Sequence, residues 1–387
     1  MKLCDSDKCT SCGACIDACP KGCISYKEDK FGFLYPQIDR KLCVECGACE
    51  SVCHVLNEVR GKRPEKAYAV WSSDPEDRKT STSGGAASVF YNTVLEEGGM
   101  CFGAAYDENS DVVIKGYGDH SNVRKFKNSK YVHSDMGDSY KQIKNLLRDG
   151  RKVIFIGLPC QVAALKTYLK RDYDKLLLVD LICHGTPPIR HLKEHIESIE
   201  SNEQKHTEYI RFRDDNAFYL TLGDSNGCFY KKHKELDTYL LSFFNGLNYY
   251  ESCYNCRYAC NERVSDITVG DFWGLGLETP FNHPYSGAIS LVLTNTEKGK
   301  SFFEMAKSKL FWEERTVDEA LKGNAQLNRP TVRNKERDRF NHQYADNGFE
   351  HASECIYSEH IKKYTKILAR QERKDKIRKF AKKLLRR

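Results

Sequence analysis

The sequence lacks a long run of hydrophobic residues. Its longest apolar stretch, residues 176–183, falls far short of the ~20 residues that a membrane-spanning helix needs. The first six residues, Met1–Ser6, contain no apolar signal region, and no segment is of low complexity. These absences exclude a membrane-spanning protein, and they lead us to expect a cytoplasmic chain in a reducing compartment.

Two binding motifs are also absent. No Gly-x-Gly-x-x-Gly sequence lies between an expected strand and an expected helix, so the dinucleotide-binding fingerprint is missing. The basic C-terminal residues 361–387 form no platform of interleaved aromatic and basic residues, so we do not predict nucleic-acid binding. The chain has 387 residues, of which 40% are hydrophobic, and this length and composition predict a globular protein of two or three domains.

What the sequence has in excess is cysteine, at 18 residues. Disulfide-rich folds are typical of small secreted domains, and this chain is neither small nor provided with an export signal. The cysteines therefore indicate metal or redox chemistry.

The charge of the chain is unevenly distributed. The formal net charge is +7, but residues 361–387 carry +11 and the rest of the chain carries −4. We predict that residues 331–387 form a basic helical tail. Its apolar residues recur at helical spacing, and they are Ile377, Phe380, Ala381, Leu384 and Leu385. The tail has three interpretations: a solvated helix docked on the body, a weak contact with an anionic membrane surface, or a contact with an acidic protein partner or nucleic acid, the last of which we do not predict.

Ten of the 18 cysteines lie in residues 4–53, where one pattern occurs twice. The first run is Cys9-x2-Cys12-x2-Cys15-x3-Cys19, and the second, 34 residues later, is Cys43-x2-Cys46-x2-Cys49-x3-Cys53. Bacterial two-cluster ferredoxins have this spacing, and the fourth cysteine of each run binds the other run's 4Fe–4S cluster. One predicted cluster therefore has Cys9, Cys12, Cys15 and Cys53 as ligands, and the second has Cys43, Cys46, Cys49 and Cys19.

Two zinc sites are the alternative interpretation of these runs. Zinc accounts for paired Cys-x2-Cys sequences, but not for a fourth cysteine three residues after each triplet. The pattern has one departure, because Pro20 follows Cys19 as expected whereas His54 follows Cys53. Residues 24–35 predict a short hairpin and residues 57–66 a linker, so we expect residues 1–60 to form a ferredoxin domain.

Residues 66–330 are predicted to form one larger domain. Apolar runs predict strands at 67–71, 100–106, 112–116, 153–156 and 176–181, and helical patterns lie at 84–97, 138–149 and 160–170. Residues 207–231 instead predict antiparallel hairpin strands. The predicted fold class is α+β or mixed α/β, with a small dicluster ferredoxin-like domain followed by a larger mixed α/β domain.

Residues 81–85, Ser-Thr-Ser-Gly-Gly, precede one of the expected helices. Two glycines let the backbone approach a ligand, and a helix N-terminus offers N–H groups to a phosphate. An ordinary helix cap and turn explain the same residues equally well.

Four further cysteines have the spacing or position of metal ligands. Cys253-x2-Cys256 supplies half of a metal site, and Cys160 and Cys183, which each follow an expected strand, are the best donors for the other half. Cys260 competes with them, and a zinc half-site, a redox dithiol or buried structural thiols are the alternatives. The cysteines left over, Cys4, Cys23, Cys101, Cys228 and Cys355, are interpreted as ordinary thiols.

Together these features resemble the beta subunits of coenzyme F420-reducing hydrogenase and related dehydrogenases, in the form with an N-terminal dicluster ferredoxin. The resemblance covers roughly residues 1–300. Its residues are Ser83-Gly84-Gly85, Lys130-Tyr131, Gly157-Leu158-Pro159-Cys160-Gln161, Leu181-Ile182-Cys183-His184-Gly185, Cys253-x2-Cys256 and Asp266-Ile267-Thr268-Val269-Gly270. The sequence Gly270-Asp271-Phe272-Trp273-Gly274 looks like that of a bacterial subgroup.

The resemblance implies FAD and a third 4Fe–4S cluster. The cluster ligands would be Cys160, Cys183, Cys253 and Cys256, and Ser83, Gly84, Gly85 and Lys130 would lie near the flavin. The implied function is an iron–sulfur flavoprotein oxidoreductase, which passes electrons between a ferredoxin or another redox protein and an organic small-molecule substrate.

A non-enzymatic subunit that delivers electrons to a separate catalytic partner is the alternative function. The sequence names neither the substrate nor a catalytic residue. His184 and Asp271 are the only candidates for a proton donor.

Overall fold

The computed structural model describes residues 2–214 and 217–384 of the chain. The chain forms two compact units, Met1–Ile189 with Tyr249–Val332 and Arg190–Asn248 with Arg333–Arg387. Among the described helices, none has both the length and the apolarity that crossing a membrane requires. The three domains predicted from the sequence stay a prediction.

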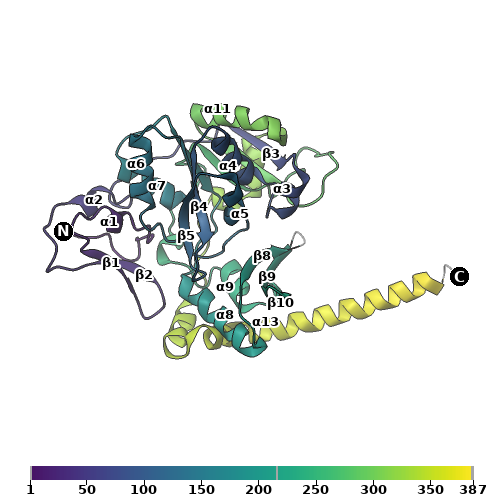
Figure 1. Ribbon diagram of the computed structural model, residues 1–387. Coiled ribbons are helices and arrows are strands. Elements are labelled where there is room, and N and C mark those ends of the chain that lie inside the picture. The colour runs from purple at the N-terminus through teal and green to yellow at the C-terminus, as the bar shows by residue number, and fades with distance from the viewer. Residues whose placement is uncertain (1, 215–216, 385–387) are drawn as a thin grey trace. The chain divides into compact units, whose positions relative to one another are not determined.

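The first unit is built on a mixed sheet (Figure 1), with the strand order β13-β3-β12-β11-β7-β6-β4-β5. The strands are β3 (Lys66–Ser72), β4 (Met100–Tyr106), β5 (Val112–Tyr117), β6 (Val153–Gly157), β7 (Leu176–Leu181), β11 (Ile267–Asp271), β12 (Ser290–Thr294) and β13 (Leu310–Arg315). Strands β4, β6, β7 and β11 pair in parallel, and β5, β12, β3 and β13 are added antiparallel at the two sides. The mixed α/β class predicted from the sequence is confirmed.

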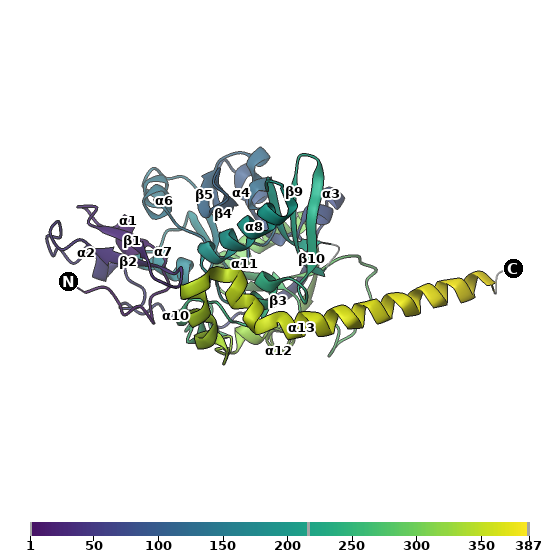
Figure 2. The ribbon, with the colours of Figure 1, turned by 90° about the horizontal axis from the view of Figure 1, so that it is seen from below.

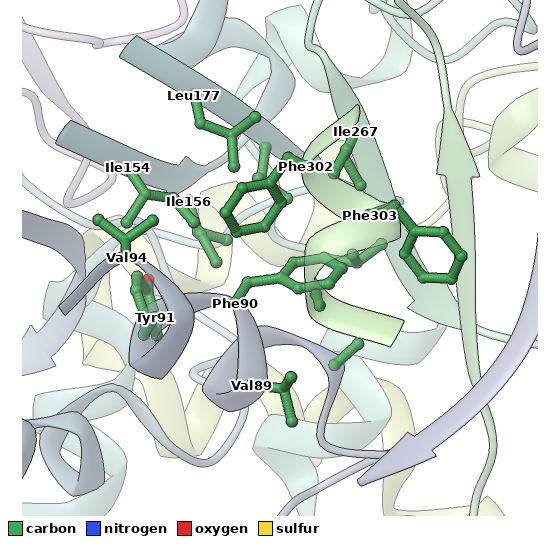
Figure 3. Close-up of a cluster of buried hydrophobic side chains, with 14 of the residues drawn as sticks. Val89, Phe90, Tyr91, Val94, Ile154, Ile156, Leu177, Ile267, Phe302 and Phe303 are labelled. Atoms are coloured by element: carbon green, nitrogen blue, oxygen red, sulfur yellow. The ribbon is translucent and has the colours of Figure 1, made fainter. Parts of the chain in front are cut away.

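Helices cover both faces of this sheet. On one face α4 (Ala86–Glu96) and α11 (Glu297–Ala306) pack over Ile154, Ile156 and Leu177, and Figure 3 shows Phe90, Phe302 and their neighbours filling the space. On the other face α6 (Ser139–Arg148) and α7 (Pro159–Leu169) pack over the alternate residues of the same strands. Because strand side chains alternate between faces, a strand buried on both sides must be apolar throughout, as β6 is.

Short elements complete the first unit. They are α3 (Pro75–Thr80), α5 (Val123–Phe126), α10 (Glu251–Tyr254), α12 (Val317–Gly323) and the 3-10 helices η1 (His120–Asn122), η2 (Lys307–Lys309) and η3 (Ala325–Leu327).

The N-terminal segment keeps its 34-residue repeat in the backbone. Helices α1 (Ala14–Asp17) and α2 (Ala48–Ser51) each begin after a glycine in the left-handed region, Gly13 with φ 74° and Gly47 with φ 79°. Strands β1 (Ile24–Glu28) and β2 (Leu34–Ile38) form the hairpin predicted from the sequence. The segment packs against α6 and α7 and is hydrogen-bonded to both helices. The hydroxyl of Tyr140 in α6 donates to the Cys12 carbonyl at 2.8 Å, and the hydroxyl of Thr167 in α7 donates to the Val52 carbonyl at 2.6 Å.

The second unit contains the antiparallel strands predicted over residues 207–231. They are β8 (Tyr209–Asp214), β9 (Ala217–Asp224) and β10 (Gly227–His233), and they are accompanied by α8 (Ile189–Glu203), α9 (Thr238–Phe244) and α13 (Arg337–Leu384). Helix α13 is two helices joined at Gly348, whose φ is 75°, and beyond that kink it runs on as a single rod (Figure 2). The apolar tail residues predicted from Ile377 onward lie outside the described side chains.

Candidate functional site

The predicted site residues of the sheet domain follow strands that end at the same edge. Strands β6, β7 and β11 are parallel, and β3 runs in the same direction because it is separated from β11 by one antiparallel strand. Cys160 follows β6, Cys183 follows β7, and the Ser83–Gly85 segment follows β3. Ligand sites of open α/β sheets lie at this carboxyl edge.

The structure brings four of the predicted cysteine ligands into mutual electrostatic contact. Burial raises the pKa of the Cys160 thiol well above its usual range, and the neighbouring thiols of Cys256, Cys183 and Cys253 raise it further. Burial likewise raises the pKa of Cys183 to about 12, again with Cys253 and Cys256 as neighbours. A bound cation would stabilise the thiolate forms of these residues, as it does for metal ligands.

A buried arginine fixes the loop that carries Cys253 and Cys256 to the end of β7. Arg263 is 2% exposed, and its guanidinium contacts the Asp180 carboxylate at 2.9 Å. The same guanidinium donates to the carbonyls of Tyr258 at 2.8 Å and Leu181 at 3.2 Å. Since Leu181 lies two residues before Cys183, Arg263 holds the two halves of the cysteine group together.

Cys260, the competing donor, is engaged elsewhere. Its thiol donates to the carbonyls of Arg257 and Glu262, both at 3.3 Å. Cys260 also contributes to the raised pKa of the neighbouring Cys256, so it lies beside the four-cysteine group and stays a competing donor. His184 also has a partner, because its Nδ1 lies 2.7 Å from the Tyr249 hydroxyl oxygen.

The ferredoxin cysteines gather in the crossed arrangement expected from their spacing. Burial raises the pKa of Cys15, and Cys12 and Cys53 contribute to that rise, so cysteines of both runs meet at the first site. The second site is a surface hollow, whose cysteines are Cys19, Cys23, Cys43, Cys46 and Cys49. All eighteen cysteines lie in the described part of the chain, and none forms a disulfide.

Two thiols beside these sites were missed at the sequence level. Cys4 interacts with Cys53 and Cys9 at the first site, and the Cys23 sulfur lies 3.4 Å from that of Cys19 at the second. The signal available was their nearness to the runs in the sequence. Within the described residues, no group of three or more His, Cys, Asp or Glu side chains has the arrangement that a single metal ion needs. The assignment of these cysteines to 4Fe–4S clusters therefore depends on the proximity of their thiols to one another and on the affinity of thiolates for iron.

The glycine pair before α4 has a packing explanation. A Cβ on Gly84 would lie 2.2 Å from the Val70 carbonyl oxygen of β3 and 2.7 Å from the Ser290 nitrogen of β12. Gly85 precedes α4 in the left-handed region, with φ 89°, and the Ser290 and Ser83 hydroxyls are 3.1 Å apart. Gly84 thus packs against β3 and β12 where no side chain fits, and Gly85 leads directly into α4.

Lys130 lies on the loop beside this segment, because the Ser129 N–H donates to the Thr82 hydroxyl at 3.1 Å. Burial lowers the pKa of Lys130 to about 7. Its ammonium donates to three carbonyl oxygens at 3.0–3.3 Å, those of Phe126, Lys127 and Asn128. The four predicted flavin residues are thus neighbours, and Lys130 has to turn from these carbonyls before it can bind an anion.

The carboxylate of Asp77 lies beside the first turn of α4. Asp77 accepts from the Ser88 hydroxyl at 2.7 and 2.8 Å and pairs with the Lys127 ammonium at 2.6 Å. An anionic ligand bound at this helix start would have to lie beside that ion pair. The hydroxyls and the ammonium fit an anion, whereas Asp77 opposes one.

Cysteines in a duplicated run with this spacing are the ligand set of a two-cluster iron–sulfur protein. Comparison with known families agrees, since residues 8–57 match the family described as "4Fe-4S dicluster domain". Residues 150–320 match the C terminus of the family described as "Coenzyme F420 hydrogenase/dehydrogenase, beta subunit". The chain therefore carries the C-terminal region of this beta-subunit family over residues 150–320 and a 4Fe–4S dicluster domain over residues 8–57. The resemblance drawn from the sequence is confirmed for the family, and the bacterial subgroup stays a prediction.

Three relatives show how far the similarity extends. A coenzyme F420-dependent sulfite reductase of Methanocaldococcus jannaschii is 25% identical over 70% of this chain and 43% of its own length. The F subunit of the F(420)H(2) dehydrogenase of Methanosarcina mazei is 19% identical over 46% of this chain and 53% of its own length. A ferredoxin-like protein of Rhizobium leguminosarum is 38% identical over 13% of this chain and 83% of its own length.

The chain spans about half the length of the first two relatives. Among solved structures, a chain of the F420-reducing [NiFe] hydrogenase complex from Methanosarcina barkeri has a TM-score of 0.46 and 17% identity, covering 78% of this chain and 94% of that one.

Proposed function

We propose that the protein is an iron–sulfur flavoprotein oxidoreductase that passes electrons between a ferredoxin-like carrier and an organic substrate. Three 4Fe–4S clusters and FAD would form the route. The observation that carries the proposal is the gathering of Cys160, Cys183, Cys253 and Cys256 at the carboxyl edge, beside the packed ferredoxin segment.

The order of the route is supported by which cysteines are neighbours. Cys12 of the first ferredoxin site contributes to the raised pKa of Cys160, whereas the hollow of the second site opens at the surface with Cys46 exposed. We therefore place the second site outermost, the first site between, and the sheet-edge cysteines innermost. Electrons could pass along this order in either direction.

The residues of the chain position the redox groups. FAD, when bound, exchanges a hydride with an organic substrate and single electrons with iron–sulfur clusters. Ser83, Gly84, Gly85 and Lys130 would hold it at the edge, and the buried thiols would release their protons as they bind iron. Two relatives are named for coenzyme F420, and we extend to this chain only the class of substrate, an organic hydride donor or acceptor.

A subunit without its own substrate is the second candidate function. One relative is named as a part of a dehydrogenase, and this chain covers about half of it. In that case the ferredoxin sites would feed a partner protein, and the isolated chain would turn over no small molecule. A bound-flavin spectrum that bleaches with reduced ferredoxin favours the first function.

Anaerobic reconstitution followed by iron and flavin assays tests the proposal. We expect about twelve iron atoms per chain, from three clusters of four, and one FAD. The variant Cys256→Ser should lose about four irons and keep the ferredoxin clusters. Cys228→Ser is the matched control, because Cys228 is exposed and lies in the other unit. An iron content near eight without flavin, or no iron loss in Cys256→Ser, would contradict the assignment.

A further inference from the structure

The two halves of the ferredoxin segment differ at positions that cluster binding does not use. The 34-residue repeat pairs Thr10 with Val44 and Pro20 with His54. Both halves carry the same four cysteines at the same spacing, and both have matching left-handed glycines before their helices. A difference at these two positions therefore calls for an explanation other than holding iron.

Beside the first ferredoxin site, Thr10 and His54 form a chain of hydrogen bonds that reaches Tyr258 of the sheet domain. The Thr10 hydroxyl lies 2.9 Å from His54 Nε2, and His54 Nδ1 lies 2.7 Å from the Tyr258 hydroxyl. His54 is 1% exposed, so both ring nitrogens depend on these partners.

The residues at the two ends of this chain lie beside cysteines. Burial raises the pKa of the Cys12 thiol, and the nearby Thr10 hydroxyl opposes that rise; the Tyr258 backbone N–H likewise opposes the rise at Cys256. A neutral His54 with its proton on Nε2 would donate to the Thr10 oxygen and accept the Tyr258 hydroxyl proton at Nδ1, so one tautomer satisfies both ring nitrogens.

Beside the second ferredoxin site, the equivalent residues Val44 and Pro20 make no such hydrogen bonds. Val44 is 58% exposed, Pro20 is exposed, and neither side chain has a polar atom. The surroundings of the first ferredoxin site, to which each repeat contributes one polar residue, are therefore the part that is hydrogen-bonded to the sheet domain.

We propose that His54 and Tyr258 form a positioning bridge, which holds the cluster of Cys9, Cys12, Cys15 and Cys53 at electron-transfer distance from the group at Cys160, Cys183, Cys253 and Cys256. This inference rests on the proposed function and deepens it. One electron crosses the bridge at a time: the donor cluster is oxidised, the acceptor cluster is reduced, and no proton is transferred. The hydrogen bonds keep the two centres in one arrangement.

Other contacts keep the ferredoxin segment docked when the bridge is removed. The Tyr140 hydroxyl bonds the Cys12 carbonyl, and the Thr167 hydroxyl bonds the Val52 carbonyl. A variant of the bridge should therefore change the coupling of the centres without releasing the segment.

The test uses the full chain reconstituted anaerobically, with Tyr258→Phe and His54→Pro as variants. Tyr258→Phe removes one hydroxyl and keeps the ring, while His54→Pro restores the residue that the pattern expects. Both should keep the wild-type iron content. After mixing with dithionite, we expect the EPR signal of the sheet-edge cluster to appear about tenfold more slowly, because the donor cluster spends less time in the productive geometry.

Two further variants separate bridging from general packing. His54→Asn keeps a polar atom near the Nδ1 position, so it should recover part of the rate that His54→Pro loses. Thr167→Val removes a hydrogen bond of the same interface but none of the bridge, and it should leave the rate unchanged. The fully reduced wild type should also show spin–spin broadening between the two centres, and Tyr258→Phe should reduce it.

Unchanged rate and unchanged broadening in Tyr258→Phe, at full iron content, would overturn the bridge and leave the proposed function standing. A wild-type iron content near eight would overturn the proposed function, and the bridge with it. The iron assay of the wild type therefore distinguishes the two failures.

Discussion

Arg263 determines the geometry of the sheet-edge cysteines through its side-chain contacts. Its fork of N–H donors bonds Asp180 and two backbone carbonyls on different segments. Lysine has the charge but not the planar fork. The Thr268 hydroxyl also donates to Asp180, at 2.6 Å, so the carboxylate would keep one partner if Arg263 were replaced.

We expect Arg263→Met to destabilise the first unit by about 3–5 kcal/mol, since it leaves Asp180 buried without its counter-ion. Iron should fall from about twelve toward eight atoms, because the ligand segments separate. Arg263→Lys should show a smaller loss of both. Urea unfolding and the iron assay measure the two effects.

Arg315→Met is the matched control for Arg263. It breaks another buried pair of the same unit, in which the Arg315 Nε lies 2.8 Å from the Glu319 carboxylate. Stability should fall while iron stays constant. Equal iron loss in both variants would mean that Arg263 acts through general stability alone.

At the same scale, the sequence predicted the two ferredoxin runs, because ligand spacing within a run is a local property of the chain, whereas the sheet-edge set joins distant segments and came from the resemblance. The sequence did not predict what holds these cysteines. His54 was visible only as a departure from the pattern, and Arg263 gave no signal, since its partner Asp180 is 83 residues away in the sequence. Such partners depend on strand pairing, which the local pattern does not contain.

At the scale of elements, the strands and helices of the sheet centre were predicted to within a few residues. Runs such as Val153–Gly157 are apolar throughout, as a strand buried on both faces must be. The sequence did not predict strands β11, β12 and β13, although residues 266–270 carry one motif of the resemblance. Their place in the sheet comes from pairing with β3 and β7, which are distant in sequence.

The turn between β3 and α4 yields a prediction about Gly84. We expect Gly84→Ala to destabilise the first unit by about 1–3 kcal/mol, since the added methyl group overlaps the Val70 carbonyl and forces β3 from α4. Denaturant unfolding followed by tryptophan fluorescence reports on this unit, because Trp71, Trp273 and Trp312 all lie in it.

Gly98→Ala is the control for this prediction. Gly98 follows α4 at φ 71°, and an added Cβ would meet no other atom there. Gly98→Ala therefore introduces backbone strain without steric overlap, and it should lower the free energy of unfolding by about 1 kcal/mol. If Gly84 serves only the approach of a ligand, Gly84→Ala would lower flavin content and leave stability unchanged.

At the scale of the whole molecule, the two compact units have separate electrostatic requirements. In the second unit His195 is buried between two carboxylates, with Nε2 3.0 Å from Asp237 and Nδ1 bonded to Glu350. Burial alone would lower the pKa of His195, but Asp237 and Glu350 raise it to about 9. The imidazolium joins α8 to α9 and α13.

This triad predicts that the second unit loses stability as pH rises. The contribution of His195 is complete below its unfolded pKa near 6.5 and is lost as the pH passes about 9, a change of about 3 kcal/mol. The pKa of Asp237 is lowered in the folded chain, so its own contribution is already present at pH 6. Between pH 6 and 9 the contribution of Asp237 therefore stays constant, and the loss of the His195 contribution lowers the stability of the second unit.

Hydrogen exchange of peptides from α8 and α9 measures this effect. The chain is equilibrated in urea at pH 6 and at pH 9 and is then exchanged briefly at one common pH. The urea midpoint of these peptides should be lower at pH 9, and His195→Gln should abolish the difference. Equal midpoints in the wild type would show that the triad is not charged as described.

The duplicated ferredoxin segment has a consequence for where electrons can enter and leave the protein. A free two-cluster ferredoxin is nearly symmetric, so it can exchange electrons with other proteins at either cluster. Here Thr10 and His54 close one end against the sheet domain, and exposed Leu42 and Val44 leave the other end open. In the proposed route, one side chain from each run, Thr10 and His54, would leave only one end of the two-cluster segment for external carriers, so these carriers would compete for that end in either direction of electron flow.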